Sequence, residues 1–271
     1  TSSWQLELAA DVGEVGLAVR HGALPNVQAD GSESDSLHDF QGALRRTTGS
    51  EYFYKYQSSQ EGTITAGTYY LAVISEGQNP RDEQSIGSGS VSFTLMSHGD
   101  MAIEDETATP LTSDSPISWL AQSLDYGEQK VYRFHVPEGL SGMELRLKNR
   151  VGNLLMSIRQ DAPSEGRIPS INSINGHADS YSAEEGGSSP SDNTDGLIAL
   201  AQPGGDYTLV VTAAQVGEQK VAAAYDVEVI AKVEAVIDFN NGRSEINGQE
   251  STTWEYFKVV VPDDAEGWDI R

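Results

Sequence analysis

The sequence predicts an all-β chain built from tandem antiparallel β-sandwich domains of a jelly-roll-like kind. Several short segments alternate apolar and polar residues, as half-buried strands do. Turn residues separate these segments, for example Pro203-Gly204-Gly205 and Ala66-Gly67. No segment carries an amphipathic helical stripe with capping residues at its ends. The 27 glycines among 271 residues suit a protein rich in turns and loops.

Each expected strand has a local reason in the sequence. The segment 131–136 alternates with period two, and 207–211 and 225–230 are rich in β-branched and aromatic residues, which favour strands. The strands expected, in chain order, are 4–7, 17–20, 52–56, 67–73, 91–95, 131–136, 143–147, 156–159, 207–211, 225–230, 254–261 and 268–271.

A long repeat organises these strands into domains. The segment 129–146 (QKVYRFHVPEGLSGMELR) aligns without gaps with the segment 254–271 (WEYFKVVVPDDAEGWDIR). The strand that begins at Met143 resembles the one that begins at Trp4. The sequence therefore predicts three parts: 1–105, a β-sandwich repeat that lacks its N-terminal strands; 106–232, a complete repeat; and 233–271, the N-terminal strands of a further, incomplete repeat. This division indicates either part of a longer tandem array or a subunit whose C-terminal strands complete the first repeat of the next copy.

The motifs resemble those of the bacterial pre-peptidase C-terminal domain. They read FHVPEGLSGMELRL, LMSIRQDAP and GGDYTLVV in the middle of the chain, and WQLEL, LAVRHGALP and AGTYYLAV near its start. The resemblance implies a secreted, non-catalytic β-sandwich module, found after protease domains and in very large extracellular repeat proteins. Relatives in secreted collagenases bind matrix protein and use calcium, but their ligand residues have no match in this sequence.

Composition excludes several classes of function. A net charge of −24 argues against a nucleic-acid surface and against docking on anionic lipid, since both need clustered Lys and Arg. The chain has no cysteine, and therefore no disulfide, thiolate zinc site or thiol nucleophile. No apolar stretch approaches the roughly 18 residues of a membrane span. Self-repulsion of this size suggests a saline or calcium-containing environment.

Two acidic segments are candidate calcium sites. Asp192, Asn193 and Asp195 precede Gly196 in an arrangement that resembles part of a calcium loop, and Asp179 could add a ligand from the same segment. The alternative is a solvated loop. Glu104 and Asp105 lie in an acidic cluster between the first two repeats, where calcium would stiffen the linker. The alternative there is a linker that like charges keep extended.

One tyrosine row is a candidate binding surface. Tyr52, Tyr54 and Tyr56 occupy alternate positions, so they share one face of the expected strand 52–56. Such a row could bind sugar or peptide, because tyrosine combines an apolar ring with a polar hydroxyl. Packing within the protein is the other interpretation of this row.

The sequence indicates no catalytic site. The five histidines have no metal-ligand spacing, and no G-x-S-x-G motif is present. We therefore expect a protein that is not an enzyme, with no cofactor apart from calcium as a candidate.

The leading hypothesis is an extracellular structural segment (stalk, filament or adhesin) of a large secreted or cell-surface bacterial protein, which could polymerise head-to-tail by strand complementation. The alternative is a substrate- or matrix-binding accessory module of a secreted hydrolase or protease. The expected partners are neighbouring copies of the repeat, or an extracellular protein or polysaccharide.

Overall fold

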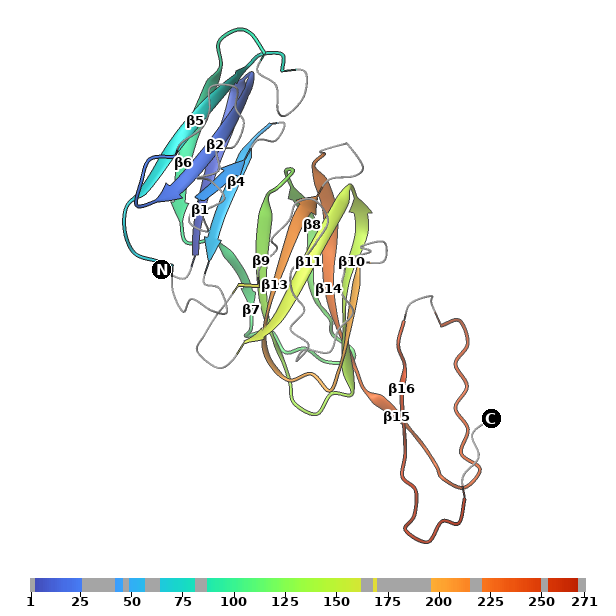
Figure 1. Cartoon of the computed structure of the whole chain (residues 1–271). Coiled ribbons are helices and arrows are strands. Elements are labelled where there is room, and N and C mark those ends of the chain that lie inside the picture. Colours follow the sequence, from blue (N-terminus) through green and yellow to red (C-terminus); the bar gives the residue numbers. More distant parts are fainter. Residues whose placement is uncertain are drawn as a thin grey trace.

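The structure, a computed structural model, is all-β in the residues that it describes: 3–25, 42–45, 49–56, 64–80, 87–161, 168–169, 196–214, 221–249 and 253–267. Within these residues it contains sixteen strands and no helix. The strands form two sandwiches and one separate strand pair, which follow one another in chain order (Figure 1). The predicted fold class is confirmed.

The N-terminal sandwich has two three-stranded antiparallel sheets, with strand orders β4-β1-β6 and β3-β2-β5. Its strands are β1 (Ser3–Val12), β2 (Glu14–His21), β3 (Gly42–Arg45), β4 (Glu51–Tyr56), β5 (Tyr69–Gly77) and β6 (Ser92–Gly99). Leu6 and Leu8 from one sheet meet Val15, Leu17 and Val19 from the other in a buried core. The sequence alternation of β1 and β2 thus becomes the two inner faces of a sandwich.

The central sandwich has two four-stranded sheets, with strand orders β12-β10-β14-β8 and β11-β13-β9-β7. Its strands are β7 (Ile103–Glu106), β8 (Ile117–Leu124), β9 (Gln129–Val136), β10 (Gly142–Val151), β11 (Asn153–Asp161), β12 (Leu197–Ala201), β13 (Gly205–Ala214) and β14 (Ala223–Lys232). All the pairings are antiparallel except that of β7 with β9.

Aromatic side chains of β8 and β9 fill the middle of the central core. The Phe134 ring stacks on the Tyr207 ring with centroids 5.8 Å apart, and Trp119 packs at a tilt against Phe134. The hydroxyls of Tyr132 and Tyr225 lie 2.7 Å apart, so the two buried tyrosines satisfy each other. Strand β9 therefore supplies much of the volume that closes this sandwich.

The two sandwiches repeat the same pairing register. Val19 pairs with Leu71 between β2 and β5, and the residues that correspond to them, Ile158 and Leu209, pair between β11 and β13. The sheets differ at one side, because no described strand of the N-terminal sandwich corresponds to β8 or β9. Strand β3 is an addition at the opposite edge, where it pairs with β2.

The C-terminal strand pair repeats the start of the central sandwich. Strand β15 (Glu234–Ile237) pairs in parallel with β16 (Tyr256–Val259), and Glu234 lies opposite Tyr256. In the central sandwich β7 pairs in parallel with β9, and Ile103 lies opposite Val131, the residue that aligns with Tyr256. The predicted boundary between residues 105 and 106 falls inside β7, which belongs to the sheet of the central sandwich.

We expect Phe134→Ala to lower the free energy of unfolding of the central sandwich by about 3–5 kcal/mol, because it removes a fully buried ring and leaves a cavity. Denaturant unfolding followed by tryptophan fluorescence measures the change. Leu120→Ala is the matched control, because Leu120 is exposed on β8 and its truncation should change stability by no more than about 0.5 kcal/mol. Equal losses in both variants would contradict the core that we describe.

Candidate functional site: the junctions between units

The acidic candidates do not form a metal site in the part of the chain that the structure describes. Asp179, Asp192, Asn193 and Asp195 lie outside the described residues, so calcium binding by that segment stays a prediction. Asp105 Oδ1 accepts hydrogen bonds from the backbone N–H (2.9 Å) and the hydroxyl (2.7 Å) of Thr107, and these bonds lower the pKa of Asp105. Glu104 and Asp105 are neighbours on β7, so their side chains point to opposite faces. No group of three or more acidic or histidine side chains able to hold a metal occurs among the described residues.

The tyrosine row lies on β4, at the contact between the two sandwiches. Phe53 points inward to the N-terminal core. The rings of Tyr52 and Tyr54 stack on the opposite face with centroids 6.3 Å apart. The backbone of Tyr56 pairs with Ser3, and its side chain lies outside the described residues. The predicted alternation of the strand is thus present, and its outer face meets a neighbouring sandwich.

Both tyrosine hydroxyls bond to the turn that leads from β8 into β9. Tyr52 donates to Asp125 Oδ2 (3.3 Å), and Tyr54 accepts from the backbone N–H of Gln129 (2.8 Å). Burial raises the pKa of Tyr52, and the nearby carboxylates of Glu128 and Asp125 raise it further. A ligand for this row would have to displace these contacts.

A small apolar cluster lies beneath the tyrosines. Met101, Val131, Leu155, Ile168 and Val210 are buried together, and Tyr54 and Ile103 pack against them. Met101 belongs to the linker between the sandwiches, and Val131, Leu155 and Val210 belong to the outer face of the sheet formed by β11, β13, β9 and β7. The linker therefore contributes an apolar anchor in addition to a strand.

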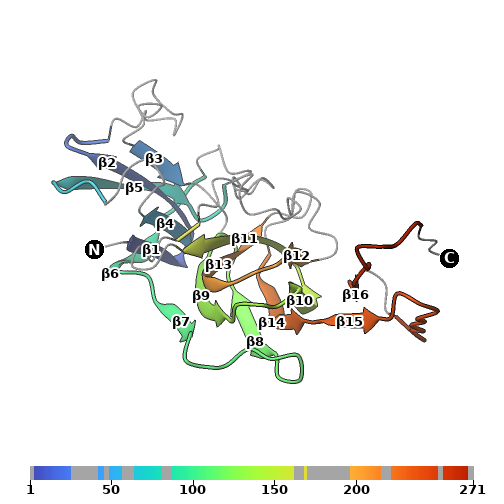
Figure 2. The same cartoon turned by 90° about the horizontal axis from the view of Figure 1, so that it is seen from below.

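A serine at the start of β1 fixes the linker. Ser3 is buried, and its hydroxyl accepts the backbone N–H of Met101 (2.9 Å). Its own N–H donates to Asp100 Oδ1 (3.2 Å). The chain leaving β6 is thus held against β1 before it enters β7. Figures 1 and 2 show this passage from the first sandwich into the edge of the second.

The second junction makes comparable contacts through different side chains. Gln129 and Trp254 are aligned positions, and the backbone N–H of Trp254 donates to Glu144 Oε1 (2.6 Å), as that of Gln129 donates to Tyr54. Glu144 is buried, and Arg146 (2.6 Å) and Lys232 (3.6 Å) balance its charge. The hydroxyl of Ser141 accepts the N–H of Glu234 (3.0 Å), much as Ser3 accepts that of Met101.

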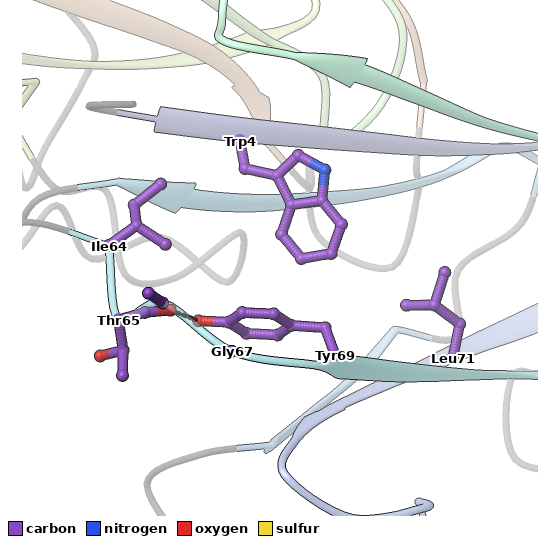
Figure 3. A pocket seen from close by; sticks show the side chains of 7 residues that line it. Trp4, Ile64, Thr65, Gly67, Tyr69 and Leu71 are labelled. Atoms are coloured by element: carbon purple, nitrogen blue, oxygen red, sulfur yellow. Dashed lines mark hydrogen bonds between the residues drawn. The ribbon is translucent and has the colours of Figure 1, made fainter.

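A cavity of about 570 Å³ opens in the N-terminal sandwich. Its lining is mostly apolar (Figure 3) and consists of Trp4, Ile64, Thr65, Ala66, Gly67, Tyr69 and Leu71. The Trp4 and Tyr69 rings meet edge to face with centroids 5.1 Å apart. The sequence did not single out this cavity, because Trp4 and Tyr69 look like ordinary core residues of their strands.

Two histidines pair with carboxylates across neighbouring strands. His135 Nδ1 lies 2.7 Å from Asp206, and His98 Nε2 lies 2.9 Å from Glu7. His135, His98 and Asp206 are exposed, as surface cross-strand pairs usually are. The expectation that the chain is not an enzyme stays a prediction. In the described part of the chain, no helix has the length and hydrophobicity needed to cross a bilayer.

Comparisons with known proteins do not assign a family. No protein-family model and no curated protein matches the chain. The chain is similar to the VP2 subviral particle of infectious bursal disease virus, with 14% identity and a TM-score of 0.20 over 84% of this chain and 56% of that chain. It is also similar to the T=1 particle of Penaeus vannamei nodavirus, with 11% identity and a TM-score of 0.19 over 84% of this chain and 80% of that chain. The chain thus spans little more than half the length of the VP2 chain, and TM-scores this low support no inference about function.

We expect Tyr54→Phe to weaken the first junction by about 1–3 kcal/mol, because the N–H of Gln129 loses its acceptor in a partly buried position. Hydrogen exchange at the Gln129 amide should accelerate, while amides at the centre of β13 keep their protection. Tyr70→Phe is the matched control, since Tyr70 lies exposed on β5, away from the junction. An unchanged exchange rate at Gln129 would contradict this role of Tyr54.

We expect Glu128→Gln to raise the melting temperature at pH 7. Burial raises the pKa of Glu128 above its ordinary value of 4.5, and the nearby charges of Asp125 and Glu7 add to this shift. A raised folded-state pKa means that folding favours the protonated carboxyl, so the ionised group destabilises the fold once the pH exceeds the unfolded-state pKa. Glutamine removes the charge and can still accept the N–H of Asp125, which Glu128 accepts at 2.8 Å.

The gain from Glu128→Gln should shrink as the pH falls toward 4, because the wild-type carboxyl is then mostly protonated in both states. Melting curves of both proteins across pH 4–8 measure this trend. Glu245→Gln, at an exposed position on the C-terminal side, is the control and should show no such convergence. A gain that grows toward low pH would have the wrong sign for a raised pKa.

Proposed function

We propose that the chain is a non-catalytic structural segment of a large secreted or cell-surface bacterial protein, in which β-sandwich domains follow one another as a stalk, filament or adhesin. The observation that carries this proposal is the repetition of the junction. The linker strands β7 and β15 pair with β9 and β16 in the same parallel register. A protein that has to hold successive domains in one geometry needs such a repeated connection.

The linkers leave little freedom between units. Three residues, Asp100 to Ala102, separate β6 from β7, and Val233 alone separates β14 from β15. In each case the chain passes from the last strand of one unit into a sheet of the next. Ser3 accepts the N–H of Met101 within the first linker, and Ser141 accepts the N–H of Glu234 directly after the second. Short, hydrogen-bonded linkers of this kind favour an extended array over independently moving domains.

The net charge is consistent with an extracellular setting for such an array. A charge of −24 keeps separate chains apart and opposes collapse of one unit onto another. Salt or divalent cations relieve this repulsion. We retain calcium as a candidate ligand of the segment around Asp192 and Asp195, as an accessory to the structural role.

The alternative function, an accessory binding module, is less well supported, because the tyrosine row on β4 is not a free binding surface. Tyr52 and Tyr54 are engaged with Asp125 and Gln129. A tethering module that acts on matrix protein or polysaccharide would need another surface. We therefore place this function second.

Small-angle X-ray scattering of the purified chain tests the structural proposal. We expect one distance between the two sandwiches that does not change with salt, because the junction bonds are partly buried. A short Gly-Ser insertion between Met101 and Ala102 should broaden the distance distribution. A wild-type distribution as broad as that of the insertion variant would contradict the proposal.

A binding assay on immobilised extracellular matrix proteins and polysaccharides separates the two functions. A stalk or filament segment should show no saturable binding. Saturable binding that survives the insertion variant would favour the accessory module.

A further inference from the structure

The first junction brings carboxylates of two sandwiches together. Glu7 of β1 lies directly opposite Tyr52 of β4, on the face that points away from the N-terminal core. Tyr52 donates to Asp125 Oδ2 (3.3 Å) in the turn that leads into β9. Glu128 belongs to the same turn, where it accepts the backbone N–H of Asp125 (2.8 Å). One acidic side chain of the N-terminal sandwich and two of the central sandwich thus lie around Tyr52.

Basic groups balance only part of this charge. Two anions, Asp125 and Glu7, and one cation, Lys130, act on Glu128 in the part of the chain that the structure describes. His98 Nε2 on β6 lies 2.9 Å from Glu7 Oε2, and it neutralises that carboxylate only when the ring carries a second proton. With His98 uncharged, the junction therefore holds an excess of negative charge that opposes contact between the sandwiches.

Partial burial gives this excess charge its effect. The Glu7 side chain is only 21% exposed, and burial raises the pKa of Glu128, with the neighbouring anions adding to the shift. The nearby tyrosines stay neutral, because burial raises the pKa of Tyr52, Tyr132 and Tyr225. Salt screens partly buried charges much less than exposed ones. Protonation is thus the effective way to remove the repulsion.

The second junction balances its charges differently. The buried Glu144 lies close to Arg146 (2.6 Å) and Lys232 (3.6 Å), which stay positive while the carboxylate is ionised. Glu234 likewise lies 3.6 Å from Lys258. The two junctions therefore make comparable backbone contacts, but the excess of negative charge belongs to the first.

We infer that the first junction is an acid-responsive contact, which opens less often as the pH falls because Glu128 and His98 take up protons. A proton on Glu128 removes its repulsion with Glu7 across the junction, and a proton on His98 neutralises Glu7 from the side of the N-terminal sandwich. Opening separates Glu128 from Glu7, so the closed junction favours the protonated form of Glu128 and gains stability toward low pH. This inference rests on the proposed structural function and adds a regulation of its junction.

Hydrogen exchange at the Gln129 amide, which donates to Tyr54 across the junction, tests the inference between pH 8 and pH 5. The protection factor compares each rate with that of an unstructured peptide at the same pH, so the intrinsic pH dependence of exchange cancels. We expect the protection of Gln129 to rise by roughly 3-fold or more as the pH falls. Constant or falling protection would overturn the inference, and so would an equal rise at the centre of β13, which reports global stability.

Charge-removing variants test the two sides of the junction. Glu7→Gln and Glu128→Gln should each raise the protection of Gln129 at pH 8 and reduce its dependence on pH. The double variant should gain less than the sum of the two, because either substitution alone removes the repulsion between these side chains. Glu245→Gln, at an exposed position outside the junction, should keep the wild-type pH dependence. Full wild-type pH dependence in the double variant would overturn the inference.

Salt separates this contact from general surface repulsion. Added sodium chloride at pH 8 should raise the protection of Gln129 less than acidification does, because Glu7 and Glu128 are partly buried. A salt effect as large as the pH effect would overturn the inference. The closed junction predominates at both pH values, so the scattering experiment is independent of these outcomes. A broad distance distribution would contradict the structural function, whereas a narrow one with protection that does not depend on pH would contradict this inference alone.

Discussion

The rest of the architecture depends on one contact, the parallel pairing of the linker strand β7 with β9 of the next unit. Strand β7 follows the N-terminal sandwich in the chain, yet its hydrogen bonds are made to β9. This pairing brings Met101 and Ile103 onto the outer face of the central sandwich, where they bury Val131 beneath Tyr54. Without β7 in the sheet, the apolar contact of Met101 and Ile103 with the central sandwich would be lost. At the junction the linker thus adds a strand to a sheet of the central sandwich, so the contact is more than the docking of two preformed surfaces.

The two sandwiches show what a single strand contributes to such a fold. Strand β9 brings Tyr132, Phe134 and Val136 into the central core, all completely buried. The N-terminal sandwich has the same framework of β1, β2, β5 and β6 but no described counterpart of that strand, and its inner face is open at Tyr69 and Leu95. The sandwich keeps a core where both sheets are present, around Leu6, Leu8 and Leu17, and Phe93 and Leu95 are exposed on β6, which has β1 as its only described neighbour. Acidic character over the whole chain counteracts nonspecific association through that surface.

Much of the fold could be predicted from local patterns, because both the strands and the repeat are encoded by neighbouring residues. The alternation of 131–136 and the β-branched run of 207–211 predicted β9 and β13, and the gap-free match of 129–146 with 254–271 predicted the relation between β9 and β16. Strands β3, β7, β8, β12 and β15 escaped prediction. All of them except β8 have only four or five residues, which is too short for a period to stand out, and three of the four residues of β7 are acidic. Its strand conformation comes from a partner about 28 residues away in sequence, which local propensity does not contain.

The candidate sites were less predictable for a related reason. The row of Tyr52 and Tyr54 was recognised as one face of a strand, but the sequence could not say whether solvent, ligand or protein covers that face. The role of the buried Glu144 could not be predicted from the sequence, because it depends on Arg146, Lys232 and the amide of Trp254, which come together only in the fold. The cavity lined by Trp4 and Tyr69 could not be predicted, because it results from the arrangement of the strands around these two residues.

The direction of β7 has a mechanical consequence. Tension along the proposed array would enter the central sandwich through Asp100 to Ala102 and run along β7. The bonds between β7 and β9 lie across the strands, so such a pull loads them together in shear instead of opening them one after another from an end. The short ladder between β7 and β9 would then fail in one step, so it would resist stretching more than the same bonds would if they opened in sequence.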